Sequence, residues 1–124
     1  DNAQGGVRLE GNANVEALYN RIRLSSDSSA DGVAVVPEGA TNSGQIIATR
    51  NLIEENSGRG IRARCAAKLT ASGNVIQANT QTGITVDNDT GACPGSGATK
   101  PTVLVSETNV ATNGEDGLVV TGSV

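Results

Sequence analysis

The sequence predicts an all-β repeat protein, a solenoid in which short strands stack coil upon coil. Three observations support this. A glycine followed by an alternating aliphatic strand recurs five times, asparagines recur at fixed offsets between these strands, and no segment has the apolar spacing of an amphipathic helix. Together they predict a single domain over residues 1–124, built from similar coils.

The composition suits a narrow aliphatic interior. The 124 residues include 16 glycines and one aromatic side chain, Tyr19, and they contain no His, Phe, Trp or Met. Val, Ile, Leu and Ala must therefore fill the core without the large aromatic side chains on which most globular cores depend. A net charge of −4 with 18% charged residues is too modest for a disordered chain.

The five glycine-led segments share one pattern. The first and third residues after each glycine are aliphatic, and the residue between them varies. Alternation with a period of two is typical of a half-buried strand. The anchoring glycines are Gly6, Gly32, Gly60, Gly83 and Gly117. The aliphatic pairs are Val7 and Leu9, Val33 and Val35, Ile61 and Ala63, Ile84 and Val86, and Leu118 and Val120.

Asparagines provide an independent second anchor. They stand at Asn20, Asn51, Asn74 and Asn109. Five residues before them come Val15, Ile46, Leu69 and Leu104, three before come Ala17, Ala48, Ala71 and Ser106, and two after come Ile22, Ile53, Ile76 and Ala111. A second asparagine column follows at Asn56, Asn79 and Asn113, with serines in the first copy and a slip of one position in the last. We expect stacked amide ladders that satisfy backbone groups at turns, where asparagine tolerates left-handed geometry.

The base repeat is 23 residues, the interval from Ile46 to Leu69. Longer intervals place insertions in 24–32, 37–45 and 87–102, the last of them 12 residues long. A unit with three short strands can close as one coil, each strand pairing with its counterpart about 4.8 Å along the axis. The expected fold is a parallel β-helix of about four coils plus an extra strand.

The pattern N-x-I-x-x-N-x-x-x-G-I-x-V at 74–86, with small departures at 51–63 and 109–120, carries a family resemblance. It resembles the right-handed parallel β-helix repeat of the pectate-lyase-like superfamily. The resemblance implies right-handed coiling. It also implies that enzymatic relatives are lyases, hydrolases or epimerases that act on polysaccharides.

The chain begins and ends on the glycine-led strand, with no amphipathic helix at either end. Uncovered strand edges invite pairing with another strand. We therefore expect either a segment of a longer solenoid or end-to-end stacking with another copy.

Cys65 and Cys93 form an even pair outside any metal-ligand pattern, and they predict one disulfide that pins the longest insertion to the preceding coil. Two buried free thiols are the alternative. A disulfide would indicate an exported protein that is extracellular, attached to the cell surface or periplasmic.

Three arginines on glycine-led strands are candidate ligand-binding residues: Arg8, Arg62 and Arg64. They are the second or fourth residue after the glycine, which predicts outward side chains, and Glu10 and Asp87 share their columns. Arginines flanked by acids can bind an acidic saccharide. Interspersed surface charge that keeps the solenoid soluble is the alternative.

The segment 87–91 places carboxylates at Asp87 and Asp89, two residues before a glycine. Such oxygen ligands could hold calcium, as in the first half of an EF-hand loop, although the remaining ligands of that loop are missing. Hydrogen bonding within an Asx turn is the alternative. The sequence suggests no other cofactor.

These observations favour a non-catalytic structural or glycan-binding domain, such as a spacer or an adhesin-like stalk. The absence of His and the single aromatic side chain argue against catalysis on sugars. The alternative is part of a carbohydrate-active enzyme, because the resemblance implies lyases in which an arginine base, here Arg62 or Arg64, works with Asp-bound calcium. The acidic charge argues against nucleic acid, and no run of 18 apolar residues predicts a membrane span.

Overall fold

The computed structural model describes residues 5–10, 14–27, 30–36, 44–64, 68–88 and 102–122. Within these ranges the chain forms thirteen strands and no α-helix. The strands are β1 (Val7–Glu10), β2 (Asn14–Leu18), β3 (Arg21–Arg23), β4 (Val33–Val36), β5 (Gln45–Thr49), β6 (Leu52–Glu54), β7 (Ile61–Arg64), β8 (Lys68–Ser72), β9 (Val75–Gln77), β10 (Ile84–Asn88), β11 (Thr102–Ser106), β12 (Asn109–Ala111) and β13 (Leu118–Gly122).

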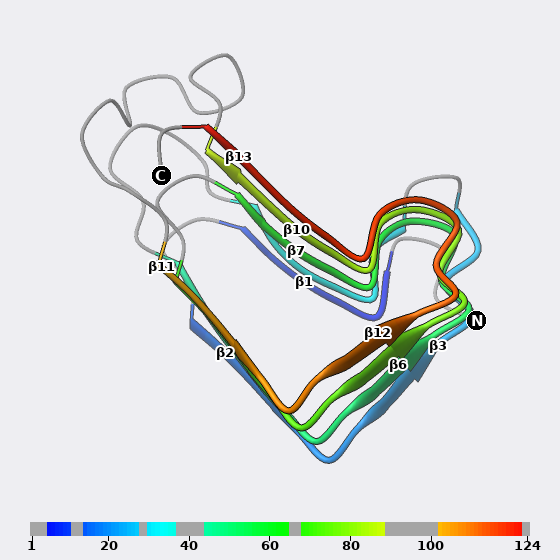
Figure 1. Cartoon of the computed structure of the whole chain (residues 1–124), viewed down its shortest axis with the longest axis horizontal. Coiled ribbons are helices and arrows are strands. Elements are labelled where there is room, and N and C mark those ends of the chain that lie inside the picture. Colours follow the sequence, from blue (N-terminus) through cyan, green and yellow to red (C-terminus); the bar gives the residue numbers. More distant parts are fainter. Residues whose placement is uncertain are drawn as a thin grey trace.

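Every third strand belongs to the same sheet, and all the pairings are parallel. The five-stranded sheet has the order β1-β4-β7-β10-β13, the β2 sheet has the order β2-β5-β8-β11, and the β3 sheet has the order β3-β6-β9-β12. Viewed down the stack, successive coils superimpose, and the five-stranded sheet faces the β2 sheet across the interior (Figure 1). The predicted parallel β-helix of four coils plus one extra strand, β1, is confirmed.

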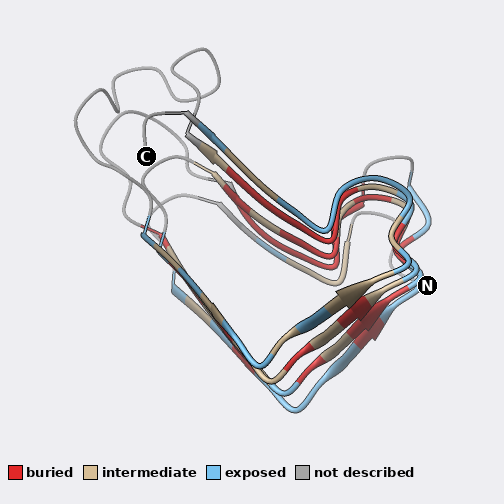
Figure 2. Ribbon diagram, viewed as in Figure 1, coloured by how far each residue is buried: buried red, intermediate tan, exposed pale blue. Residues whose placement is uncertain are grey.

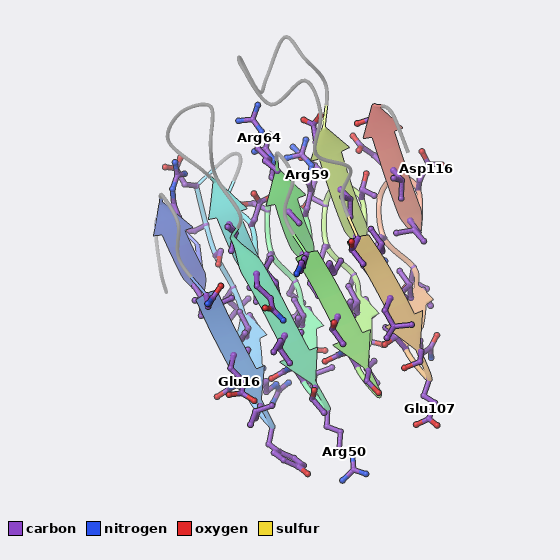
Figure 3. All side chains as sticks on the ribbon, turned by 90° about the vertical axis from the view of Figure 1, so that its left-hand side faces the viewer. Glu16, Arg50, Arg59, Arg64, Glu107 and Asp116 are labelled. Carbon is purple, nitrogen blue, oxygen red and sulfur yellow. The ribbon has the colours of Figure 1, made fainter. Side chains whose placement is uncertain are left out.

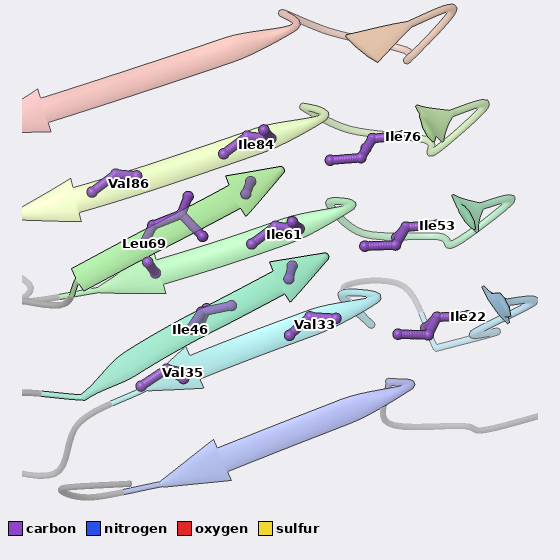
Figure 4. Close-up of a cluster of buried hydrophobic side chains, with 13 residues drawn as sticks. Ile22, Val33, Val35, Ile46, Ile53, Ile61, Leu69, Ile76, Ile84 and Val86 are labelled. Atoms are coloured by element: carbon purple, nitrogen blue, oxygen red, sulfur yellow. The ribbon is translucent and has the colours of Figure 1, made fainter. Parts of the chain in front are cut away.

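The core is a set of aliphatic ladders inside this coil. Buried and partly buried residues alternate along strands such as β5 and β7. Ile22, Ile53 and Ile76 stack in the β3 sheet, whereas Ile46 and Leu69 pair in the β2 sheet and face Val33, Ile61 and Ile84 (Figure 4). Burial is densest in the middle coils (Figure 2). Stacking identical columns explains how a chain with one aromatic side chain closes a core.

Four of the five recurrent glycines, Gly6, Gly32, Gly60 and Gly83, are required by space rather than by unusual backbone angles. A Cβ atom on Gly60 would lie 2.4 Å from Ile76 Cγ2 and 2.6 Å from the carbonyl oxygen of Gly83. Gly32 faces the same contacts one coil away, with Ile53 Cγ2 at 2.6 Å. The glycine column therefore lets the turn approach the isoleucine ladder and the next coil, which a side chain would prevent.

The two predicted amide ladders form. In the first, the backbone N and Nδ2 of Asn51 both donate to Asn74 Oδ1, at 2.9 and 3.0 Å. In the second, Asn56 donates in the same way to Asn79 Oδ1, at 3.2 and 2.9 Å, and Asn79 donates to Asn113. Each Nδ2 also donates to a carbonyl of the preceding coil, for example from Asn79 to Ile53. The ladders thus satisfy backbone N–H groups at two corners of the first three coils.

The expectation that the asparagines themselves take left-handed geometry is wrong. The left-handed residue directly precedes each ladder position, because it turns the corner and the asparagine then points inward. These residues are Tyr19, Arg50, Gly73 and Glu107 at one corner, and Leu24, Glu55, Ala78 and Thr112 at the other.

The last coil is shifted by one residue from its predicted alignment. Val103 pairs with Leu69 and Val110 with Ile76, so Leu104, Ser106 and Ala111 do not occupy the predicted columns. Thr108 takes the position assigned to Asn109, and Asn74 N donates to Thr108 Oγ1 at 3.4 Å. With this register the second asparagine column has no slip, since Asn113 stacks directly on Asn79.

The insertion predicted within 24–32 is visible at its two flanks, between β3 and β4. Ser57 N donates to Ser25 O and Gly58 N donates to Ala30 O, each at 3.0 Å, so the first coil has more residues between these bonds than the next coil. Most of 37–45 and 87–102 lies outside the described residues, as do Cys65 and Cys93, so the disulfide stays a prediction. In the described part of the chain, no helix has the length and apolarity needed to cross a bilayer.

Candidate functional site

Two of the predicted arginines point outward from one strand. In β7, Ile61 and Ala63 are fully buried, and Arg62 and Arg64 alternate with them on the outer face. Both arginine side chains are about one quarter exposed. The period of two predicted this orientation, and the rigid sheet fixes where both guanidinium groups emerge.

A buried carboxylate holds two of the guanidinium groups. Asp31, in the turn before β4, is 7% exposed. Its Oδ1 accepts a hydrogen bond from the backbone N of Arg59 at 2.9 Å and lies 3.6 Å from Arg59 Nη1. Its Oδ2 lies 3.7 Å from Arg62 Nη1. Asp31 therefore ties the turn before β7 to the outer face of the five-stranded sheet.

A second ion pair lies at the other end of β7. Arg64 Nε lies 3.7 Å from Asp87 Oδ2 on β10, and Thr121 Oγ1 on β13 donates to Asp87 Oδ1 at 3.2 Å. The Asp87 carboxylate therefore links three neighbouring strands, β7, β10 and β13. Asp89 lies outside the described residues.

Arg8 extends the set along the axis. In the parallel register Arg8 pairs with Ala34, and Ala34 pairs with Arg62, so Arg8 lies two strands from Arg62 in the same column. Two strand spacings correspond to about 10 Å. We call Arg8, Arg59, Arg62 and Arg64 the arginine face. In the view of Figure 3, Arg59 and Arg64 lie toward the upper edge of the molecule, and Arg50 and Glu107 lie at the lower edge.

Burial sets the electrostatic character of the arginine face. The pKa of Arg62 is lowered from its ordinary value, first because burial disfavours the charged form and then because the Arg59 cation lies nearby, while Asp31 opposes the shift. Arg62 remains a cation near neutral pH. Its buried Nε has no hydrogen-bond partner. The site therefore offers fixed, partly desolvated guanidinium donors, which suit a carboxylate or sulfate ligand.

The described residues do not form a metal centre by themselves. Among them no group of three His, Cys, Asp or Glu side chains converges. The Asp87 carboxylate faces Arg64 and Thr121, and a guanidinium beside it opposes a divalent cation. These contacts favour a structural role for Asp87.

The β3 sheet carries a charged network that the sequence did not indicate. Glu54, on the outer face of β6, is 6% exposed. Arg21 Nε and Nη2 donate to its Oε1 at 3.0 and 2.6 Å, and Gln77 Nε2 donates to its Oε2 at 3.0 Å. These bonds, that from Gln77 first, lower the pKa of Glu54 below 4.5 despite the opposing effect of burial. The network stabilises three coils rather than forming an open site.

Asp31 and Arg59 were also missed, although a signal was available. Each directly precedes an anchoring glycine, Gly32 or Gly60, so opposite charges occupy one position in adjacent coils. Alignment of the residue before each glycine would have found them. The apolar columns drew attention to the residues after it.

Comparison with known proteins identifies the family. The family described as "Right handed beta helix region" matches residues 1–99. No curated protein and no solved structure matches the chain. The family match covers most of the chain, and the three parallel sheets have the architecture that its description states. The chain therefore belongs to the right-handed β-helix family.

Proposed function

We propose that this chain is a structural, glycan-binding β-helix domain of an exported protein, and that its arginine face holds an acidic polysaccharide. The supporting observation is the fixed set of guanidinium groups on the outer face of the five-stranded sheet. Arg59, Arg62 and Arg64 outnumber the two carboxylates paired with them, on a chain whose net charge is −4. The acidic molecule as a whole repels polyanions, so it disfavours non-specific polyanion binding. The local cationic face nevertheless favours an anionic ligand at that face.

The repeat also suits the ligand geometrically. Arg8 and Arg62 are about 10 Å apart along the axis, which is about the length of two sugar units. An extended uronic acid chain that lies across the strands would therefore present successive carboxylates to successive coils. The same stacked coils make the domain stiff, as a spacer or a surface stalk requires.

The test is titration calorimetry with oligogalacturonate and with a neutral oligosaccharide of equal length. We expect binding of the acidic oligomer only, weakening as salt rises and lost in the Arg62→Ala/Arg64→Ala double variant. Arg50→Ala is the matched control, because Arg50 is exposed at a different corner, where Nη1 donates to the hydroxyl of Tyr19 at 3.0 Å. Equal binding by the double variant and the wild type, or no binding at all, would refute the proposal.

Calcium is included as a second variable of the same titration. Asp87 and Asp89 remain a proposed calcium site at which a metal ion would bridge the ligand to the loop that follows β10. A calcium-dependent increase in affinity that Asp89→Asn abolishes would support it. An unchanged affinity would restrict recognition to the arginines.

A carbohydrate-active enzyme is the second candidate, favoured by one observation. Burial lowers the pKa of Arg62, the direction that a base would need. Incubation with polygalacturonate should then yield unsaturated products that absorb in the ultraviolet. Binding without product formation would leave the non-catalytic role.

Another copy of the chain is a further proposed partner. In the last coil, inward residues such as Val110 and Val120 are only partly buried, and Leu118 is 48% exposed. Because the five-stranded sheet has one strand more than the others, pairing β1 of one copy with β13 of the next would join that sheet alone. Sedimentation should show concentration-dependent association that Leu118→Lys abolishes. A monomer at all concentrations would exclude stacking.

A further inference from the structure

The last described coil carries a chemically reactive pair of residues. Asn113, the final described residue of the second ladder, is the one asparagine in the sequence that a glycine follows. The ladder asparagines Asn56 and Asn79 are followed by serine and threonine. Deamidation of asparagine is fastest before glycine, because glycine has no Cβ to keep its backbone nitrogen away from the asparagine Cγ. The last coil therefore differs from the inner coils in its chemistry at an equivalent position.

Packing requires the glycine of this pair. A Cβ atom on Gly114 would lie 2.1 Å from the carbonyl oxygen of Thr80 in the preceding coil. That oxygen belongs to the backbone of a stacked coil, so it cannot move aside without displacing the stack. The pair lies at the corner where the chain leaves β12 and bends toward β13 (Figure 1). The reactive sequence is therefore a consequence of the fold at this corner.

The preceding coil holds both reacting groups while the ladder is closed. Asn113 Oδ1 accepts hydrogen bonds from the backbone N and Nδ2 of Asn79, at 3.2 and 2.9 Å. Asn113 Nδ2 donates to Ile76 O at 3.3 Å. Gly114 N, the nitrogen that would attack the side chain, donates to Asn79 O at 2.8 Å. The closed ladder therefore keeps Gly114 N away from Asn113 Cγ.

The last described coil should open more easily than the coil before it. Its inward residues Val110 and Val120 are only partly buried, whereas Ile76 and Ile84 in the preceding coil are fully buried. Local opening needs the least free energy where the fewest apolar contacts are lost. The rate of a reaction that needs the open coil then follows the population of that open state.

The reaction of the open coil needs only water. Gly114 N forms a bond to Asn113 Cγ, the bond from Cγ to Nδ2 breaks, and Nδ2 leaves as ammonia with the proton from Gly114 N. The resulting cyclic imide then takes up one water molecule. Attack of water at the side-chain carbonyl gives aspartate, and attack at the backbone carbonyl gives isoaspartate. Both routes return the proton to Gly114 N and leave a carboxylate at position 113.

Neither product fits the closed ladder. Aspartate places an oxygen where Asn113 Nδ2 donated to Ile76 O, so two acceptors would face each other. It also adds a negative charge next to Glu115 and Asp116 in the sequence. Isoaspartate lengthens the backbone directly before Gly114, which packs closely against the preceding coil. We propose that Asn113 is a deamidation site that reacts only when the last coil opens, and that its product prevents the coil from closing again.

The first test is peptide mapping by mass spectrometry of the full chain during incubation at mildly alkaline pH, with and without urea. We expect the change from amide to acid at Asn113 before any other asparagine, and faster in urea, which opens every coil. Asn79→Ala removes two bonds to Asn113 Oδ1, so it should speed the reaction in water about tenfold.

The control for this measurement is Asn20→Ala, in the first coil, which should leave the rate at Asn113 unchanged. An equal rate at Asn113 in water and in urea would show that the coil does not protect it and would overturn the proposal. An earlier change at another asparagine in urea would overturn it as well.

The second test examines the product. Asn113→Asp reproduces one product, and Asn113→Thr is the matched control, because a threonine cannot deamidate. Thr108 already ends the first ladder in this way, since its Oγ1 accepts a hydrogen bond from Asn74 N at 3.4 Å. We therefore expect the last coil to close in Asn113→Thr and to stay open more often in Asn113→Asp.

Hydrogen exchange followed by NMR measures this opening at single amides. Gly114 N and Ile84 N bond between the last coil and the one before it. Both should exchange about tenfold faster in Asn113→Asp than in Asn113→Thr. Val33 N, which donates to Gly60 O between earlier coils, should exchange equally in the two variants. Equal exchange at Gly114 and Ile84 would overturn the proposal. Neither test involves the arginine face, so its failure and failure of this site are distinguishable.

Discussion

The coil formed by β8, β9 and β10 and the coil formed by β11, β12 and β13 occupy equivalent places in the three sheets, yet they bury their side chains differently. Leu69 and Ile76 in the inner coil are at most 1% exposed. Their partners in the last coil, Val103 and Val110, are only partly buried. The inner coil is covered by a neighbour on both sides and the last described coil by one.

The glycine that opens the third strand of each coil shows the same difference. A Cβ atom on Gly60 would contact both the isoleucine ladder and the next backbone, whereas one on Gly117 would meet only Val110 Cγ1, at 3.7 Å. Identical sequence positions thus carry different physical constraints. In a solenoid the energy of a residue depends on its neighbouring coils, so the effect of a substitution should depend on which coil carries it.

The largest expected effect on stability comes from removing an inner asparagine of the second ladder. Asn79 Oδ1 accepts hydrogen bonds from the backbone N and Nδ2 of Asn56, and Asn79 Nδ2 donates to Ile53 O and Asn113 Oδ1. Asn79→Ala leaves several buried groups unpaired, at roughly 1–3 kcal/mol each, so we expect a loss of about 4 kcal/mol in the free energy of unfolding by urea.

The matched control lies at the start of the first ladder. The Asn20 side chain is exposed and donates only to Leu18 O, at 3.0 Å. Asn20→Ala should therefore cost about 0.5 kcal/mol. Equal losses for Asn79→Ala and Asn20→Ala would show that the ladder does not hold the coils together.

The glycine column provides the second test. Gly60→Ala places a Cβ 2.6 Å from the backbone oxygen of Gly83, which cannot move without displacing the next coil. We expect destabilisation of about 3 kcal/mol from overpacking. Gly117→Ala should change stability by no more than about 0.5 kcal/mol, since its site is open. Thermal unfolding of both variants measures the difference, and a large effect at Gly117 would indicate that another coil covers this end.

The repeat was predictable because it consists of residue types that strongly prefer particular positions in a coil. Columns of Ile, Val and Leu and columns of Asn and Gly each have one place in a coil, so the sheets and the ladders followed from spacing alone. The alignment predicted for the last coil was wrong because threonine can replace asparagine at the end of a ladder. Thr108 accepts the bond from Asn74, and the neighbouring Asn109 offered a false anchor.

The candidate sites were harder to predict, because they depend on contacts between columns. Arg62 and Arg64 were placed on the outer face correctly, since strand alternation determines it. The contact of Arg62 with Asp31 and the network around Glu54 depend on long side chains that reach across the register, which spacing does not encode.

Glu54 provides a smaller, pH-dependent test of the inner coils. Its column carries Gln77 in the next coil and Ala111 in the last, so the charged network links the first three coils and does not extend to the last one. The folded-state pKa of Glu54 lies below the ordinary 4.5, so its contribution is present above pH 4.5 and is lost as the pH falls through the lower folded value. Glu54→Gln should cost about 1 kcal/mol near neutral pH.

The measurement is urea unfolding of Glu54→Gln and wild type across the acid range. The two proteins should converge in stability well below pH 4.5, where Glu54 is protonated in both the folded and unfolded states. A difference that stays constant with pH would mean that the network acts through packing rather than through charge.

The smallest expected effect concerns the corners, where inner and last coils should behave alike. Ala78 and Thr112 both hold φ at 52°, in the left-handed region that costs a non-glycine residue about 1–2 kcal/mol. Gly73 already occupies such a position, with φ at 64°. Ala78→Gly and Thr112→Gly should each raise stability by up to about 1 kcal/mol, because relief of backbone strain exceeds the added flexibility of the unfolded chain.

Gly73→Ala should lower stability by a similar amount, because alanine is strained at this positive φ. The loss should be no larger, since the added Cβ would meet only the flexible side chain of Arg50. If thermal unfolding showed a gain for Ala78→Gly alone, strain at the corners would also depend on the covering coil. Backbone geometry would then vary along the stack as side-chain burial does, contrary to the expectation that inner and last coils behave alike at their corners.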